Sequence, residues 1–191
     1  MKSTYHHGDL KEELIKTGLR MIQKAGIEKL SLRKLAAECG VSEAAPYSHF
    51  KNKKELVLAI HAYTAEQLKE CLKDAYEHTD KKDSPNAILN MGKAYVMFFI
   101  RYPEYYTFLF SQSDIHITLS SGCAEDDFPP FQYYRQKVYL VYRKEGMDEE
   151  RIKYGVIAMW GKVHGIAAIA AMKGVEKDFE WENVLEKILV E

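Results

Sequence analysis

The chain has 191 residues, of which 47% are hydrophobic and 29% charged, a composition that excludes a disordered or fibrous protein. The net charge of −1 excludes a uniformly basic coat for nucleic acid, but residues 1–60 carry a net +4 and residues 61–191 a net −5. A basic N-terminal segment on an acidic remainder fits a DNA-binding part attached to a domain with another task.

The number and spacing of the cysteines and the composition of the first residues indicate a cytoplasmic protein. The three cysteines, Cys39, Cys71 and Cys123, have no metal-ligand spacing and are odd in number, which favours a reducing cytoplasm. The first residues contain no apolar run of the kind that a signal peptide needs. The adjacent pair His6-His7 lacks a third ligand, so a polar arm near DNA is preferred to a metal site. No metal or other cofactor is expected.

The first predicted helix runs from about Asp9 to Ala25. Gly18 lies in its middle, where glycine costs about 1 kcal/mol relative to alanine, so another helix should approach closely there. The predicted inner face consists of Leu10, Leu14, Thr17, Gly18, Met21, Ile22 and Ala25.

Residues 31–39 predict a short second helix. Ser31 precedes it as an N-cap, and Gly40 follows it, where a left-handed residue commonly ends a helix. The helical spacing i, i+3, i+4, i+7 marks one buried face. This face is Leu32, Leu35, Ala36 and Cys39.

A third helix is expected from Glu43 to about His49, with Ser42 as its cap. Pro46 stands at about the fourth helical position, where at most one backbone hydrogen bond is lost. Helix, glycine-containing turn and helix is the pattern of the helix-turn-helix, whose second helix enters the DNA major groove. An ordinary helical hairpin of a protein core is the alternative.

Three cations in four positions, Lys51, Lys53 and Lys54, mark the start of a long helix predicted over 53–78. Asn52 and Glu55 have the spacing of a capping box for that helix. Cations beside the free N–H groups of a helix N-terminus form a phosphate site, which favours DNA binding over the plain hairpin.

At this point the sequence resembles the DNA-binding domain of the TetR/AcrR family of one-component transcriptional repressors, over about residues 5–60. The motif is L-x-x-L-A-x-x-x-G-V-S-x-x-x-x-Y-x-H-F-x-x-K-x-x-L. It is carried by Leu32, Leu35, Ala36, Gly40, Val41, Ser42, Tyr47, His49, Phe50, Lys53 and Leu56.

The expected DNA contacts divide into two kinds. The start of the recognition helix points at the groove floor, so base contacts are expected from Glu43, Ala44 and Ala45, and Arg33 is expected at a base or a phosphate. Phosphate contacts set the register and carry little sequence information. They are expected from Ser31, Ser42, Tyr47, His49, Lys51 and Lys53, with Ser48 on the same surface.

The rest of the chain also predicts helices, over 85–101, 104–112, 129–146, 149–173 and 178–190. Residues 113–127 predict a long loop. The expected fold is therefore all-α with about nine helices. We expect a three-helix DNA-binding domain over 1–52 and a helical ligand-binding and dimerisation domain over 53–191, with the helix 53–78 as connector.

The second domain carries an unusual number of aromatic residues. A packed core is the favoured explanation for any single ring, but the group exceeds what a small bundle needs, and ligand pockets are mostly apolar and aromatic with few polar groups. The segment Trp160-x-x-x-His164-Gly165 also resembles the W-x-x-x-H-G signature of one subgroup of TetR-like regulators. The expected ligand-binding residues are Met91, Tyr95, Phe98, Phe99, Tyr102, Tyr106, Phe110, Tyr134, Trp160 and His164.

Small residues on the helix 149–173 allow a second helix to approach. Gly161-x-x-x-Gly165 also occurs in membrane helices, but Lys162 and His164 in mid-segment and a short apolar run argue against a span. The family resemblance implies that the last two long helices of each subunit form a dimerising four-helix bundle. The expected interface residues are Ala158, Gly161, Gly165, Ala168, Trp181, Val184, Leu185 and Ile188.

These observations predict a cytoplasmic, ligand-responsive repressor that binds a palindromic operator as a dimer and is released by a small lipophilic effector. Its partners would be double-stranded DNA, the effector and a second copy of the chain, with no membrane. The alternatives are a helical enzyme with His164 as acid or base, an activator of the same fold, and a helical interaction protein that no longer binds DNA. No nucleophile, paired-carboxylate or metal arrangement supports an enzyme.

Overall fold

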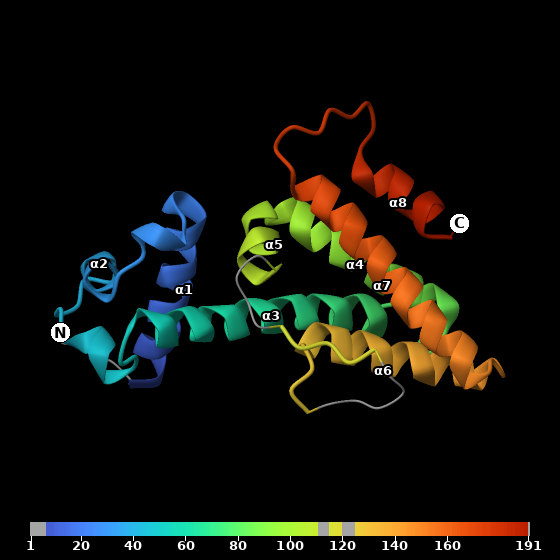
Figure 1. Ribbon diagram of the computed structural model, residues 1–191, viewed down its shortest axis with the longest axis horizontal. Coiled ribbons are helices and arrows are strands. Elements are labelled where there is room, and N and C mark those ends of the chain that lie inside the picture. The colour runs from blue at the N-terminus through green and yellow to red at the C-terminus, as the bar shows by residue number, and fades with distance from the viewer. Residues whose placement is uncertain (1–6, 111–114, 120–124, 191) are drawn as a thin grey trace. The chain divides into compact units, whose positions relative to one another are not determined.

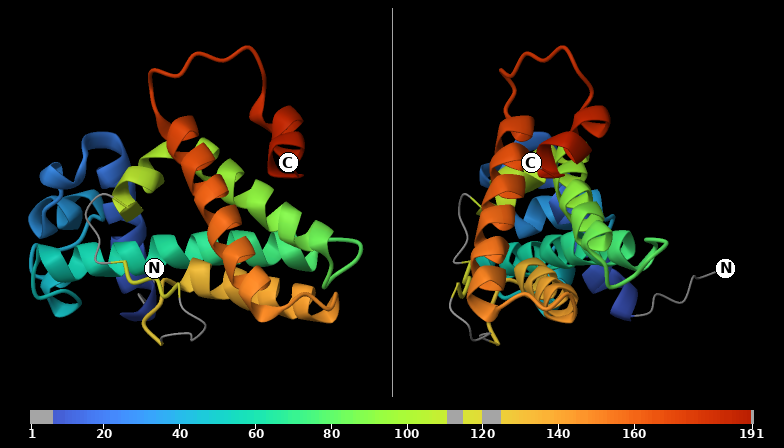
Figure 2. Two further views of the ribbon diagram at one scale, coloured as in Figure 1. Left: turned by 45° about the vertical axis from the view of Figure 1, so that its right-hand side comes forward. Right: turned by 90° about the vertical axis from the view of Figure 1, so that its right-hand side faces the viewer.

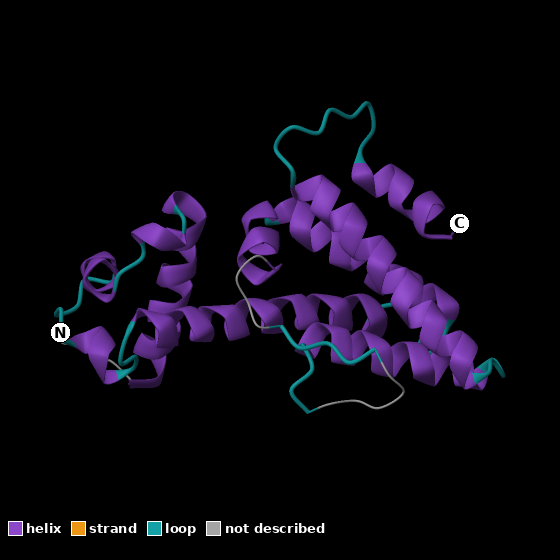
Figure 3. Cartoon of the chain, viewed as in Figure 1, coloured by secondary structure: helices purple, strands orange, loops and turns teal. Residues whose placement is uncertain are grey.

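The computed structural model describes residues 7–110, 115–119 and 125–190 (Figure 1). Within these residues it contains helices and loops and no strand (Figure 3), so the predicted all-α class is confirmed. The helices are α1 (His7–Ala25), η1 (Ile27–Lys29), α2 (Leu32–Glu38), η2 (Ala45–Ser48), α3 (Lys53–Glu77), α4 (Pro85–Arg101), α5 (Pro103–Phe110), α6 (Pro129–Lys144), α7 (Glu149–Ala171) and α8 (Trp181–Val190).

The described residues form eight α-helices where about nine were predicted, and the missing one is the recognition helix. It is the short 3₁₀ helix η2. Pro46 has no N–H to donate, so the neighbouring N–H groups bond three residues back instead of four. These bonds run from Ala45 N to Ser42 O, Tyr47 N to Ala44 O and His49 N to Pro46 O, at 3.0, 3.1 and 3.1 Å. The residue before η2 is Ala44 and no side chain caps it, so the expected cap at Ser42 is wrong.

The turn between α2 and η2 depends on Gly40. Its φ of +66° lies in the left-handed region that glycine enters without strain. The N–H of Gly40 bonds to Ala37 O at 3.2 Å and the N–H of Val41 to Ala36 O at 3.0 Å. This pair of bonds is the Schellman motif, which satisfies the last carbonyls of α2 and turns the chain sharply toward η2.

The chain divides into two compact units, Met1–Thr64 and Ala65–Glu191, here called the head and the body. Helix α3 begins in the head and ends in the body, because the division falls inside it. The expected boundary between residues 52 and 53 stays a prediction.

The head packs α1, α2 and the first half of α3 around Leu14, Leu35, Leu56 and Ile60, which are fully buried. A Cβ atom on Gly18 would lie 2.7 Å from Ile60 Cδ1, so the predicted close approach at this glycine is confirmed.

Two residues of the predicted inner face of α1 lie elsewhere. Met21 is half-buried and Ala25 exposed, whereas Leu10, Leu14, Thr17, Gly18 and Ile22 are buried as predicted. Leu19, which the predicted face leaves out, is buried as well, so the buried side of α1 is turned away from Met21 and Ala25 and toward Leu19. Met21 and Ala25 line a hollow that is described below.

In the body, α7 and α8 pack against α4 (Figures 1 and 2). Helix α4 has the predicted bounds and buries Tyr95, Val96 and Phe99 almost completely. A Cβ atom on Gly92 would lie 3.3 Å from Leu189 Cδ1 and 3.4 Å from Val163 Cγ1, so α7 and α8 both approach α4 at this glycine. Trp181 and Leu185, expected at a dimer interface, are buried in the core of their own chain, because α8 folds back on α4.

Residues 115–119 adopt no regular structure, in agreement with the predicted loop. Hydrogen bonds join them to the two residues before α6 and to Arg135 on that helix. Asp127, with a completely buried side chain, accepts a hydrogen bond from Thr118 N at 2.7 Å, and Phe128 N donates to His116 O at 2.8 Å. Arg135 Nη1 donates to Thr118 O at 3.2 Å. The rest of the predicted loop, residues 113–114 and 120–124, lies outside the described residues.

The left-handed Gly40 predicts a specific effect on stability. Gly40→Ala should lower the free energy of unfolding by about 1–2 kcal/mol, because a Cβ atom disfavours this conformation. Gly40→Asn is the control and should cost less, since asparagine tolerates the left-handed region. Urea denaturation followed by circular dichroism measures both. Equal stability of Gly40→Ala and the wild type would contradict the motif.

Candidate functional site

The predicted DNA contacts lie on or beside α2, η2 and the start of α3, all within the head. At the beginning of α2, Ser31 Oγ accepts a hydrogen bond from Lys34 N at 3.2 Å, which confirms the predicted N-cap. The hydroxyl proton of Ser31 is not used in this bond and stays available to an acceptor such as a phosphate oxygen.

Two expected base contacts bind each other. Arg33 Nε donates to Glu43 Oε1 at 2.9 Å, and both side chains are exposed. The sequence pattern does not predict this pair, because two residues ten positions apart across a turn produce no helical periodicity. Because the contact uses only Nε, Glu43 does not occupy the two terminal guanidinium nitrogens of Arg33. The contact also gives the Arg33 side chain a defined direction.

The surface of η2 is small and polar. Ala44, Tyr47 and Ser48 are exposed and Ala45 is half-buried, while Pro46 is buried and holds the turn against the head core. Ser48 Oγ donates to Ala45 O at 2.7 Å. The Ser48 hydroxyl therefore donates its hydrogen bond within the turn and not to an outside acceptor. The Tyr47 ring, in contrast, is exposed to solvent.

The residues predicted to contact phosphates on either side of η2 differ in their exposure to solvent. Ser42 and Lys51 are exposed and Lys53 is half-buried. The Nε2 atom of His49 is shut off from solvent and has no hydrogen-bond partner among the described residues, so an outside phosphate would have to approach Nδ1.

The predicted capping box at the start of α3 is confirmed in part, because Asn52 caps the helix while the return bond of Glu55 goes to the N–H of Lys51 and not to that of Asn52. Glu55 N donates to Asn52 Oδ1 at 3.0 Å, and Lys51 N donates to Glu55 Oε2 at 2.8 Å. These two bonds fix the chain direction between η2 and α3, and they hold Lys51 and Lys53 at the same end of the helix.

The expected ligand-binding residues lie together in the body. Tyr95 stands between Phe99 and Trp160, with ring centroids 5.1 and 5.0 Å away in edge-to-face arrangements. The cluster takes residues from five segments of the chain. They are Met91, Tyr95, Phe98 and Phe99 on α4, Tyr102 after it, Tyr106 and Phe110 on α5, Tyr134 on α6, and Trp160 and His164 on α7.

His164 is held by two tyrosines. Tyr95 Oη lies 2.9 Å from its Nδ1, and Tyr106 Oη lies 2.9 Å from its Nε2. A neutral imidazole has one donor and one acceptor nitrogen, so one tyrosine donates to the ring and the other accepts from it. Burial lowers the pKa of His164 and raises the pKa values of both tyrosines. The ring is a core histidine whose two nitrogens are both hydrogen-bonded, which leaves it poorly placed to act as an acid or base.

Two tyrosine hydroxyls of α6 have no hydrogen-bond partner among the described residues. Tyr134 is buried among aromatic rings, with Trp160 at a centroid distance of 5.6 Å, and Tyr133 is half-buried. Burial raises the pKa of both, that of Tyr133 to about 12. An unpaired buried hydroxyl is costly, so Tyr134 is a polar group available to a molecule that enters the cluster.

Helix α7 presents an unpaired face of small and apolar residues. Ala158, Gly161 and Gly165 are exposed and Ala168 is half-buried, and a Cβ atom on either glycine would meet nothing within 4 Å. Tyr154, Ile169 and Met172 continue this face and are 47–60% exposed. Among the described helices, α7 alone has the length and hydropathy of a membrane span, but Trp160, Val163 and Ala167 pack its opposite face into the body.

Comparison with known proteins agrees with the surface on the head. Residues 14–60 match the family model described as bacterial regulatory proteins, tetR family. The chain is 42% identical over 50 residues to the tetracycline repressor protein class C of Escherichia coli, and 40% identical over 60 residues to the nicotine-responsive transcriptional repressor HdnoR of Paenarthrobacter nicotinovorans. These matches cover 26% and 31% of this chain, and 23% and 31% of the two relatives.

The whole chain shares its fold with solved regulators. A putative transcriptional regulator from Pseudomonas aeruginosa PAO1 superposes with a TM-score of 0.71 at 14% identity, over 98% of this chain and 90% of that one. Residues 14–60 of the head are therefore similar to the DNA-binding domain of the tetR family, and the similar proteins are transcriptional regulators and not enzymes.

The pKa of His164 predicts a pH dependence of stability. The unfolded ring takes up a proton near its ordinary pKa of about 6.5, whereas the folded ring resists it. The stabilisation is therefore complete above about 6.5 and is lost as the pH falls through the lowered folded pKa. His164→Gln keeps one donor and one acceptor but does not titrate, so its unfolding free energy should fall less on acidification.

The measurement is urea denaturation of both proteins at neutral and mildly acidic pH. His78→Gln is the control, because His78 is exposed and the Tyr95–His164–Tyr106 contacts stay intact. It should keep the wild-type dependence. A His164→Gln protein with the wild-type dependence would show that this ring does not resist protonation.

Proposed function

We propose that this chain, whose head is similar to the TetR-family DNA-binding domain, is a cytoplasmic, ligand-responsive transcriptional repressor that binds a palindromic operator as a dimer. The observation that carries the proposal is the head surface on which Ala44, Tyr47 and the capped start of α3 lie beside the Arg33–Glu43 pair. The relatives' names support it, since one is a tetracycline repressor and another a nicotine-responsive repressor.

Base reading is assigned to Arg33, Glu43, Ala44 and Ala45. Glu43 aligns Arg33, whose terminal nitrogens then offer two donors, the arrangement that suits O6 and N7 of guanine. Ala44 leaves room for a base edge and meets a thymine methyl without competing hydrogen bonds. Because η2 is short, this small set of side chains would carry most of the sequence preference.

Phosphate binding is assigned to Ser31, Ser42, Tyr47, Lys51 and Lys53, with His49 through Nδ1. These groups lie before, within and after η2, so they would hold the turn in the groove from both sides.

The direct test is selection of bound fragments from genomic DNA, followed by gel shift. The wild type should enrich fragments with a two-fold symmetric site. Ala44→Gln should enrich a different sequence with its fold intact, because the amide adds a donor and an acceptor at the groove floor. Ala62→Gln, at an exposed position of α3, is the matched control and should keep the wild-type preference. A chain that enriches no fragment is an interaction protein and not a regulator.

The dimer is assigned to the unpaired face of α7, together with Val184 and Ile188 of α8. Gly161 and Gly165 have open space where a second helix can approach, and the neighbouring apolar side chains would be buried by it. Burial of this face in a second copy also accounts for an apolar helix better than a membrane span does.

Gly165→Leu should weaken the dimer, because overpacking a close helix contact costs typically 1–3 kcal/mol, or about 5–150-fold in affinity. Gly155→Leu makes the same change on the same helix away from this face, and should leave the dimer unchanged. Sedimentation equilibrium over a series of concentrations measures both. A wild type that is monomeric at micromolar concentration, or equal losses in the two variants, would refute this interface.

The effector is assigned to the aromatic cluster of the body, which also carries the Trp160-x-x-x-His164-Gly165 signature of the subgroup named above. Apolar rings with few polar groups suit a lipophilic molecule, and the acidic body favours a neutral or cationic one. Tyr134 Oη, which is buried and has no hydrogen-bond partner among the described residues, is the group that such a molecule would engage. Helix α3 begins at Lys53 in the head and supplies Leu68, Leu72 and Tyr76 to the body core, so it would connect the DNA contacts to the core that contains the cluster.

Repression is relieved only if the effector binds the two arrangements of the dimer unequally. A coupling of about 1–3 kcal/mol is typical of such proteins. An activator of the same fold would share both sites, and a reporter gene placed behind a selected fragment separates the two outcomes.

A further inference from the structure

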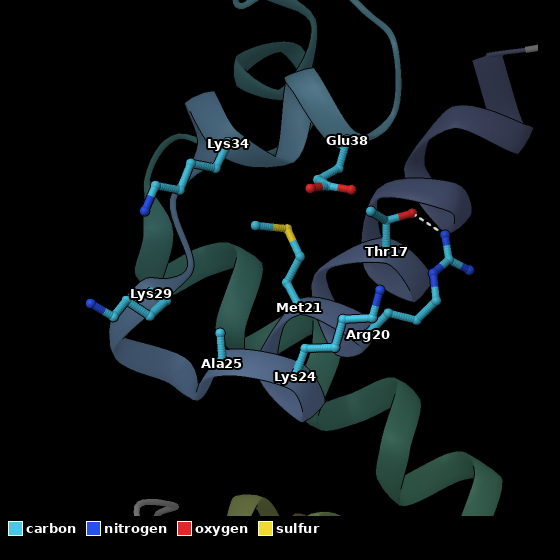
Figure 4. Close-up of a pocket in the computed structure, with 8 residues that line it drawn as sticks. All are labelled: Thr17, Arg20, Met21, Lys24, Ala25, Lys29, Lys34 and Glu38. Carbon is cyan, nitrogen blue, oxygen red and sulfur yellow. Dashed lines mark hydrogen bonds between the residues drawn. The ribbon is translucent and has the colours of Figure 1, made fainter.

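The head contains a hollow that the proposed function does not use. It lies between α1, η1 and α2 and has a volume of about 380 Å³. Figure 4 shows Met21 at its centre, with Lys29 and Lys34 on one side and Thr17 and Arg20 on the other. Lys24, Ala25 and Glu38 complete the lining.

The cations around this hollow differ in how they are paired. Arg20 Nη2 donates to Glu13 Oε1 at 2.9 Å and also contacts Thr17 Oγ1, so a carboxylate already balances its charge. Lys24, Lys29 and Lys34 are exposed and have no carboxylate partner among the described residues. These three lysines are called the lysine rim.

The lysine rim is continuous with the DNA surface. Ser31, a proposed phosphate contact, stands between Lys29 and Lys34 in the sequence, and its Oγ holds the backbone N–H of Lys34. A polyanion lying against Ser31 would therefore pass close to Lys29 and Lys34, the two rim lysines on either side of Ser31 in the sequence. DNA carries one negative charge per about 1.7 Å of helix axis, so its backbone extends beyond the bases that the turn reads.

A small anion inside the hollow fits less well. The floor consists of Met21 and Ala25, and the Glu38 carboxylate projects into the space, where it would repel a negative ligand (Figure 4). Lysine ammonium groups on flexible stems at the edge instead suit a charged chain that crosses the mouth.

We infer that Lys24, Lys29 and Lys34 bind the phosphate backbone of DNA flanking the operator half-site. The inference rests on the proposed DNA binding and enlarges the footprint of each head beyond the helix-turn-helix. The rim adds affinity for any sequence and no base preference, because phosphate contacts carry none.

The test compares salt dependence of binding to a mixed-sequence duplex that extends one helical turn beyond the region contacted by the turn. Fluorescence anisotropy in a series of potassium chloride concentrations gives the slope of log K against log salt. Lys24→Gln/Lys29→Gln/Lys34→Gln should lower this slope by about 0.9 for each lost phosphate contact, or about 2–3 per head. On a duplex cut at the edge of the turn's contacts, the variant and the wild type should differ much less.

Three controls make the result specific. Lys81→Gln/Lys144→Gln/Lys173→Gln removes the same charge from exposed positions of the body and should keep the wild-type slope. Lys53→Gln removes a proposed contact near the turn and should lower the slope by about one on both duplexes. Glu38→Gln should strengthen binding to the long duplex, a gain that damage to the fold cannot imitate.

Equal slopes for the rim and body variants, or equal losses on both duplexes, would overturn the inference. If Lys53→Gln lowers the slope while the rim variant does not, the inference fails and the proposed function stands. If the wild type binds neither duplex, both fail. Calorimetry with sodium triphosphate covers the remaining case: binding that the rim variant loses, with an unchanged DNA slope, would make the hollow a small-anion site and refute the DNA contact.

Discussion

The left-handed conformation of Gly40 is the constraint on which the DNA-binding surface depends. The two bonds of the Schellman motif end α2 abruptly, and the chain must reverse within a few residues. Pro46 then limits the next segment to a 3₁₀ turn, and its own burial fastens that turn to the head. With Phe50 also buried, the side chains of residues 44–50 that stay exposed are those of Ala44, Tyr47 and Ser48, so backbone geometry rather than side-chain attraction selects this part of the reading surface.

The body follows a different principle, in which one polar group organises an aromatic core. His164 accepts one hydrogen bond and donates another, and this places α5 and α4 against α7 through Tyr106 and Tyr95. A protonated ring would leave a tyrosine proton without an acceptor, so the neutral form belongs to the packed state. Tyr134 differs from Tyr95 and Tyr106, because its buried hydroxyl has no hydrogen-bond partner among the described residues. A ligand that satisfies Tyr134 while separating the rings would act on the same packing that holds α4 and α7 together.

Most helix bounds could be predicted from the sequence, because proline, glycine and capping residues mark the ends of the helices. Ser84-Pro85 and Tyr102-Pro103 delimit α4, and both of its predicted ends agree with the structure. The recognition segment was predicted as an α-helix because periodicity does not distinguish a short α-helix from a 3₁₀ turn, and the effect of Pro46 was underestimated. Site positions followed from the family motif, but the Arg33–Glu43 contact did not, since it joins two elements across a turn.

Apolar faces raise a related difficulty, because a face does not reveal which neighbour covers it. Trp181 and Leu185 were assigned to a partner chain and are covered by their own, whereas Gly161 and Gly165 remain open. The hollow lined by Met21 and Ala25 could not be predicted for the same reason, because apolar residues at these positions are equally typical of a buried helix face.

The central claim is that two copies of the chain present their turns to successive major grooves. Nitroxide labels on Ser48→Cys, an exposed position of η2 to which no DNA contact is assigned, measure this most directly, with Cys39, Cys71 and Cys123 replaced by serine and the distance taken by pulsed electron resonance on a selected DNA fragment. The account predicts one narrow distribution centred near the spacing of about 34–36 Å between half-sites one helical turn apart. A broad distribution on bound DNA, or no interaction between the labels, would contradict it.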